Sequence, residues 1–243
     1  MPPTSDWKSL SFVRQCIMAP LTSNQLKAGI HALANDVVDA SLHWQLCLGL
    51  DEAARKWPLV IQQSNTFWVY TIKAHHNNSV LALCRAFDQE TKSLHICALL
   101  RLIRSNLPLF RQENFRQRLR DNPFVESLAE SAVAPDAAQL TADILSCSSA
   151  DPLVKRLVVH RNTTIAHSSL KLRLNDTSAR SDEVITDDDY ETLLGRAKEI
   201  LNRYSGLFNA EYFSTQPIGH KDYETIFRWV QERVEAEAAR RSV

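Results

Sequence analysis

Apolar residues recur along much of the chain at the spacing of one face of a helix. From Leu26 to Leu42 they return every three or four residues, rather than at every second residue as in a half-buried strand. Thr22 or Ser23 can cap this helix, because each offers a side-chain oxygen to the unpaired N–H groups of the first turn. The apolar stripe then needs a partner helix to cover it. A short helix is expected before it, at 6–18.

The same pattern predicts further helices downstream. Segment 59–87 follows the break at Trp57-Pro58 and carries Phe67 and Trp68, and we expect it to form a central, largely buried helix with these aromatic rings in the core. Capping residues mark later starts, with an aspartate before a proline at 151–152 and a threonine before three aspartates at 186–189. The predicted helices cover about 59–87, 93–105, 136–145, 152 onward, 187–208 and 223–240, with a connector at 121–138 and a polar loop at 172–186.

Composition favours helices over sheets. The 243 residues include only 5 glycines, fewer than the turns of a sheet protein of this size would use, while 44% of the residues are hydrophobic. We therefore predict an all-α fold, a helical bundle. The length is at the upper end of what one hydrophobic core supports, so a single domain spanning residues 1–243 is expected.

Charge is balanced overall but not locally. Lys+Arg and Asp+Glu are both 28, which excludes the global positive field of a histone-like or polybasic membrane-binding protein. Between Arg101 and Arg120, however, the chain carries six arginines and one glutamate, with Phe110 and Phe115 among them. This stretch is either a solvated helix face or a surface that binds RNA phosphates and stacks bases on its two rings. Arg101 and Arg104 are its candidate substrate-binding residues.

The cysteines and the N-terminus indicate a cytoplasmic protein. Five cysteines are odd in number and widely spaced, so reduced core thiols are expected rather than a disulfide framework. The N-terminus lacks a basic region followed by a sustained apolar run, and no stretch approaches about 18 uncharged apolar residues. No membrane partner is expected. The five thiols are Cys16, Cys47, Cys84, Cys97 and Cys147.

Two sequence blocks carry a family resemblance. The first, NTFWVYTIKAHHNNSVLALCRAFDQ at 65–89, has an aromatic pair, an Ala-His step and an apolar helix that ends in Arg-x-x-Asp. The second, HRNTTIAHSS at 160–169, has an arginine, a polar neighbour and an Ile-Ala-His. In this order, with a polar loop and a closing helix after them, they resemble the AbiU2-like group of HEPN proteins over about residues 25–210.

The resemblance implies a HEPN-like bundle with additional flanking helices at both ends. It implies a homodimer whose two signatures face each other, acting as a metal-independent endoribonuclease in phage defence by abortive infection or in a toxin-antitoxin pair. The expected partners are RNA, a second copy of the chain, and an antitoxin or a protein from a neighbouring gene. No cofactor is expected. Other HEPN members have lost catalysis and bind RNA, nucleotides or protein, which is the alternative prediction for this chain.

The signature supplies the groups that RNA cleavage without a metal requires. His167 titrates near neutral pH and suits proton transfer. Arg161 is permanently charged and forked, and suits the phosphate oxygens. Asn162 is the polar neighbour that would position the substrate or the histidine.

Helix geometry complicates this assignment. A separation of six residues turns His167 by about 120° from Arg161 and moves it about 9 Å along an ideal helix. The two side chains therefore share a site only if the helix is irregular across Thr163-Thr164, if the long arginine reaches around, or if the second subunit completes the pair.

Three other arrangements use neighbouring residues. His160 and His167, seven apart, lie on nearly one helix face and would suit a metal-dependent hydrolase, but no third ligand stands at suitable spacing, so no metal site is predicted. His75 and His76 are either accessory groups of the same cleft or core residues whose polar atoms have partners. Arg85 and Asp88, three apart, are expected to form a local ion pair. Arg161 and His167 themselves have a purely structural alternative, as a hydrogen-bonding pair.

Overall fold

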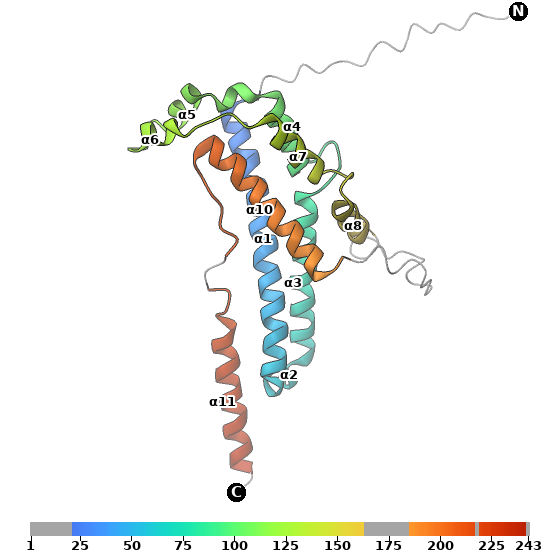
Figure 1. The fold of residues 1–243 in the computed structure, drawn as a ribbon. Coiled ribbons are helices and arrows are strands. Elements are labelled where there is room, and N and C mark those ends of the chain that lie inside the picture. The colour runs from blue at the N-terminus through green and yellow to red at the C-terminus, as the bar shows by residue number, and fades with distance from the viewer. Residues whose placement is uncertain (1–20, 163–184, 217–218, 242–243) are drawn as a thin grey trace, which may run out of the picture.

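The computed structural model describes residues 21–162, 185–216 and 219–241, and every regular element in these ranges is a helix (Figure 1). The predicted all-α fold is thus confirmed. The elements are α1 (Ser23–Lys56), α2 (Pro58–Gln63), α3 (Asn65–Ala86), α4 (Ile96–Ser105), η2 (Leu107–Phe110), α5 (Gln112–Arg118), α6 (Val125–Glu130), α7 (Ala137–Ser146), α8 (Pro152–His160), α10 (Asp187–Asn209) and α11 (Tyr223–Arg241).

A long helical hairpin forms the spine of the molecule. Helix α1 runs along it, α2 makes the turn and α3 returns beside α1, while α10 crosses both (Figure 1). The starts of α1 and α10 lie where the capping residues predict them. The side chains of Thr22 and Thr186 each accept a hydrogen bond from the backbone N–H three residues on. The side chains of Gln25 and Asp189 in turn accept from the backbone N–H of Thr22 and Thr186, so each helix begins with a complete capping box.

The main core lies where α10 meets the upper part of the hairpin. Leucine, isoleucine and aromatic side chains from α1, α3, α4, α7, α8 and α10 are buried there. A polar network sits inside it: the Tyr190 hydroxyl contacts the Ser79 hydroxyl and donates to the Ser79 carbonyl at 3.0 Å, and Ser79 Oγ donates to the carbonyl of Ala40 at 2.8 Å. Because these buried polar groups have partners, the network fixes how α10 sits on α1 and α3.

A second, smaller core holds α11. Phe227 is completely buried against Trp57 and Trp68, whose ring centroids lie 5.5 Å and 4.6 Å from its own. Helix α11 therefore packs near α2, at the turn of the hairpin (Figure 1).

The prediction of one buried helix over 59–87 was wrong in two respects. The chain breaks at Ser64 into α2 and α3, and the first half of α3 lies at the surface, with 60% of Phe67 and 66% of Tyr70 exposed. Burial begins at Ser79, where α10 crosses. Apolar content alone cannot distinguish the covered half of a helix from the uncovered half.

The basic stretch is divided among three elements. Arg101 and Arg104 are exposed on α4, but Phe110 and Phe115 are buried, which excludes the alternative in which these two rings stack bases. Arg118 packs over the ring of Phe208 and donates to its backbone carbonyl at 2.7 Å, which caps the end of α10. Part of this positive charge therefore serves the fold.

Two predicted segments fall largely outside the described residues, namely the helix at 6–18 and the polar loop at 172–186. Within the part of the chain that is described, the cysteines at 47, 84, 97 and 147 are buried and unpaired with one another. In the same part, no helix combines the length and the apolar character needed to cross a membrane.

Candidate functional site at the end of helix α8

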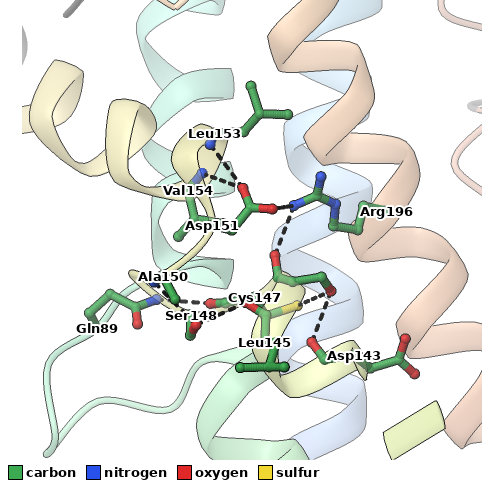
Figure 2. Close-up of polar contacts among 11 residues, drawn as sticks. Gln89, Asp143, Leu145, Cys147, Ser148, Ala150, Asp151, Leu153, Val154 and Arg196 are labelled. Carbon is green, nitrogen blue, oxygen red and sulfur yellow. Dashed lines mark hydrogen bonds and ion pairs between the residues drawn. The ribbon is translucent and has the colours of Figure 1, made fainter. Parts of the chain in front are cut away.

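The direction of α8 is set by the turn that precedes it (Figure 2). Asp151 accepts hydrogen bonds from the backbone N–H groups of Leu153 and Val154 at 2.9 and 3.1 Å, which caps the helix as predicted. Arg196 of α10 then bonds both sides of the turn, because one nitrogen lies 2.9 Å from the Asp151 carboxylate and 2.8 Å from the carbonyl of Ser146. The end of α7 and the start of α8 are thereby fixed to α10.

The turn is also attached to the end of α3. Gln89 donates to the carbonyl of Cys147 at 3.0 Å (Figure 2). It also accepts from the backbone N–H of Ser149 at 3.1 Å. Further along α8, the carbonyl of Leu157 lies 3.9 Å from the thiol sulfur of Cys84. Helix α8 therefore starts beside the end of α3 and lies next to its C-terminal part.

Arg161 follows directly on the last turn of α8. It keeps helical dihedral angles, and together with Asn162 it lies in a wider, π-type turn. Its Nε donates to the side-chain oxygen of Asn162 at 3.0 Å, and Nη1 lies 3.5 Å from the carboxylate of Asp88. The side chain is 26% exposed. The regular α-helix therefore ends at His160, just before the stretch from Arg161 to His167 for which the angle of about 120° assumed an ideal helix.

Asp88 connects the signature arginine to the end of α3. Burial alone would raise the pKa of this carboxyl, but hydrogen bonds from the backbone of Gln89 and Glu90 and the charge of Arg161 outweigh it and hold the pKa below its usual value. The predicted local pair of Asp88 with Arg85 is wrong. Arg85 instead reaches Asp36 on α1 at 2.7 Å, because it projects from another face of α3.

Histidines of α3 neighbour both α8 and α1. Burial lowers the pKa of His160, and the nearby His76 lowers it further. His75 lies with its Nδ1 2.8 Å from Nδ1 of His43 on α1, and burial followed by the charge of His43 lowers its pKa as well. The candidates His75 and His160 thus have different partners, His43 and His76, and in each case burial favours the neutral form.

Arg101 of α4 and Asp88 both lie close enough to His95 to act on it. His95 caps the start of α4, and its pKa is lowered chiefly by burial; Asp88 opposes this shift and Arg101 adds to it. Both charges therefore act on the same imidazole. Arg104 lies one turn further along α4, exposed like Arg101. His167 lies outside the described residues, and so does the geometry of the His160–His167 pair. Among the residues that the structure describes, no three His, Cys, Asp or Glu side chains gather closely enough to hold a metal ion.

A comparison with known protein families identifies the family of this chain. The family model HEPN_AbiU2, described as AbiU2, matches residues 23–226. The chain belongs to the AbiU2 family of HEPN proteins. The match includes α1 through α10 and the whole signature, and it extends past both ends of the stretch at 25–210 that the resemblance covered. No curated protein and no solved structure matches the chain.

Membership of the AbiU2 family makes this a HEPN protein of the abortive-infection type. Sequence reasoning missed two residues that hold the AbiU2 signature in place. Asp88 stood in the sequence as part of Arg-x-x-Asp, but its partner lies 73 positions away in the chain. Arg196 is one of many polar residues on α10, and nothing in its spacing marks it as the residue that clamps the turn before α8.

Proposed function

We propose that this AbiU2 protein is a metal-independent endoribonuclease of a phage-defence or toxin-antitoxin system, acting as a HEPN dimer. The observation that supports this most is the setting of Arg161. Its guanidinium stands at the end of a clamped helix and is partly exposed, and the two contacts to Asn162 and Asp88 use two of its five N–H donors. A phosphate can therefore be bound without breaking the contacts that orient the side chain.

In this reaction a ribose 2′-hydroxyl attacks the adjacent phosphorus, and the bond from phosphorus to the 5′-oxygen breaks. His167 moves the proton, as the base at the 2′-hydroxyl or the acid at the leaving oxygen. Arg161 stabilises the charge that builds on the non-bridging oxygens, and Asn162 holds Arg161. The products are a 2′,3′-cyclic phosphate and a 5′-hydroxyl. Arg101 and Arg104 bind neighbouring phosphates.

The dimer is part of the proposal because each signature is completed by the other copy. Two signatures that face each other supply two arginines and two histidines to one phosphate, which removes the need for both groups of one chain to share a helix face. An antitoxin or neighbouring-gene protein would act by covering this cleft.

The test is cleavage of labelled RNA by purified protein in EDTA, with Arg161→Ala and His167→Ala beside the wild type. Each substitution should lower kcat/KM by about 100-fold or more, the range for loss of a proton-transfer group or an oxyanion-stabilising donor. Arg233→Ala is the matched control, because this arginine is exposed on α11 and pairs within its own helix with Glu237. Equal cleavage by the wild type and both signature variants would refute the proposal.

A non-catalytic RNA-binding module is the second candidate, and one observation favours it. The charge of Arg161 already faces a carboxylate whose pKa is held low, so the arginine also has a structural partner. This reading expects RNA binding whose salt dependence weakens when Arg161, Arg101 or Arg104 is replaced, with no product formed.

A further inference from the structure

A cavity of about 330 Å³ opens between α1, the first half of α3 and the start of α10. Its apolar wall comes from α1 and α3, and two rings stand in it, Trp44 and His76, with centroids 6.3 Å apart. Trp44 is fixed in place, since it packs against Tyr190 at 4.4 Å and its indole N–H donates to Glu191 at 3.2 Å. The volume is at the lower end for ligand sites, which suits one flat ring system rather than a large molecule.

This cavity lies beside the end of α8. His76, on its wall, is close enough to His160 to influence the pKa of that imidazole, and Arg161 is the next residue. The start of α10 is joined to α8 as well, because Arg156 bonds Asp189 at 2.8 Å, two residues after Asp187 on the cavity wall. The Arg161 guanidinium lies at Asp88, past the end of α3, and that end is ten residues or about 15 Å beyond His76. An RNA strand bound at Arg161 can therefore place in this cavity a base a few nucleotides away.

The charged groups on the wall are two carboxylates and one ammonium, from Asp51, Asp187 and Lys73. This balance disfavours a phosphate and favours a neutral group rich in N–H donors. Asp51 is already paired with Arg55, one turn along α1. Asp187, the first residue of α10, and Lys73 on α3 add an acceptor and a donor to the lining.

We propose that this cavity binds a guanine base of single-stranded RNA a few nucleotides from the scissile phosphate. The inference rests on the proposed function, of which it names the substrate preference. The guanine ring stacks against His76 and the Trp44 wall, Asp187 accepts from its N1–H and N2 amino group, and Lys73 donates to O6. Recognition of unpaired bases by stacking together with hydrogen bonds to the Watson–Crick edge is the usual way that proteins read single-stranded RNA.

The other bases fit this pair of groups less well. Adenine and cytosine place an acceptor nitrogen beside a single amino donor, so one oxygen of the Asp187 carboxylate would face a lone pair. Uracil offers one N–H between two carbonyl oxygens. Only guanine presents two adjacent donors to the carboxylate and a carbonyl to the ammonium. The expected preference for guanine is about tenfold or more in Kd, the size of discrimination for one good bidentate contact.

The test measures binding without cleavage. Short oligouridine RNAs with every 2′-hydroxyl methylated, with or without one central guanosine, are titrated against the full chain by fluorescence anisotropy. The wild type should bind the guanosine-containing RNA at least about tenfold more tightly. Asp187→Asn should remove this preference, because an amide presents a donor to one of the two guanine N–H groups. His76→Ala should weaken binding of every RNA through lost stacking.

Asp188→Asn is the matched control, since it removes the same charge from the same first turn of α10 but its residue does not line the cavity. It should keep the preference for guanine. Equal binding of both RNAs by the wild type, or an equal loss in Asp187→Asn and Asp188→Asn, would overturn the guanine site. Cleavage of RNA without guanine preference would support the nuclease proposal and contradict the guanine site. Guanine-selective binding without cleavage would support the guanine site and contradict the nuclease proposal.

Discussion

Single residues around α8 are coupled to their surroundings by charge as well as by packing. Asp88 holds Arg161 from the end of α3, and His43 and His75 meet nitrogen to nitrogen at 2.8 Å. Only one of two facing imidazole nitrogens can carry the shared proton, so the pair is stable when at most one ring is charged. Burial adds to this preference and lowers the pKa of His75 in the folded state.

The histidine pair predicts a pH dependence of stability. Because the pKa of His75 is lower in the folded than in the unfolded chain, the unfolded chain binds more protons once pH falls below about 6.5. The stability that neutral His75 contributes is therefore present at pH 7.5 and is lost as the pH falls below about 6.5. Urea unfolding at pH 7.5 and 5.5 should show a smaller loss in His75→Gln than in the wild type. An equal loss would contradict the role of this pair.

At the scale of the elements, α8 depends on contacts that lie far from it in the sequence. Its own residues supply the cap, but α10 and the end of α3 fix the turn before it through Arg196 and Gln89. A short helix of this kind gains most of its stability from such tertiary contacts. The position of Arg161 is consequently a property of three helices.

Arg196→Ala should release this turn. The arginine makes one charge-assisted bond to Asp151 and one to the carbonyl of Ser146, so its loss should lower the free energy of unfolding by about 2 kcal/mol. Hydrogen exchange of the α8 amides should accelerate more than that of α1. Arg55→Ala serves as the control, since this arginine is largely exposed and its removal should stay within about 0.5 kcal/mol. Unchanged exchange in α8 would show that the turn is fixed by other contacts.

At the scale of the whole molecule, the described part of the bundle has two cores of unequal size. The main core unites α1, α3, α4, α7, α8 and α10, and the second holds α11 against the turn of the hairpin. The family match ends at residue 226, so most of α11 lies beyond it. Whether residues 1–243 unfold as one domain, as the length predicts, depends on how strongly this small core is coupled to the large one.

Phe227 is the residue that tests this coupling. Its ring is fully buried between Trp57 and Trp68, and Phe227→Ala should cost about 3–5 kcal/mol if the chain unfolds cooperatively. The whole transition in denaturant would then shift. Trp229→Ala, two positions along the same helix, is the control because Trp229 is 65% exposed. A transition that splits in two, with the larger part unshifted, would contradict a single cooperative domain.

The sequence by itself determined the class of fold and most helix boundaries. Capping at Thr22, Asp151 and Thr186 is local chemistry, in which a side chain bonds the backbone within three residues, and so it could be predicted from neighbours in the chain. The family resemblance likewise depended on short blocks. The Arg161, Asn162 and His167 signature was therefore recognised before any geometry was available.

Only the tertiary structure decided what each helix covers and what the signature contacts. Burial of Ser79 and exposure of Phe67 on one helix depend on where α10 crosses, and Asp88 meets Arg161 because α8 lies next to the end of α3. The same crossing places Asp187 opposite His76 and Trp44 in one cavity. These contacts join residues many tens of positions apart, and the free energy that selects them comes from packing of whole helices rather than from any local pattern.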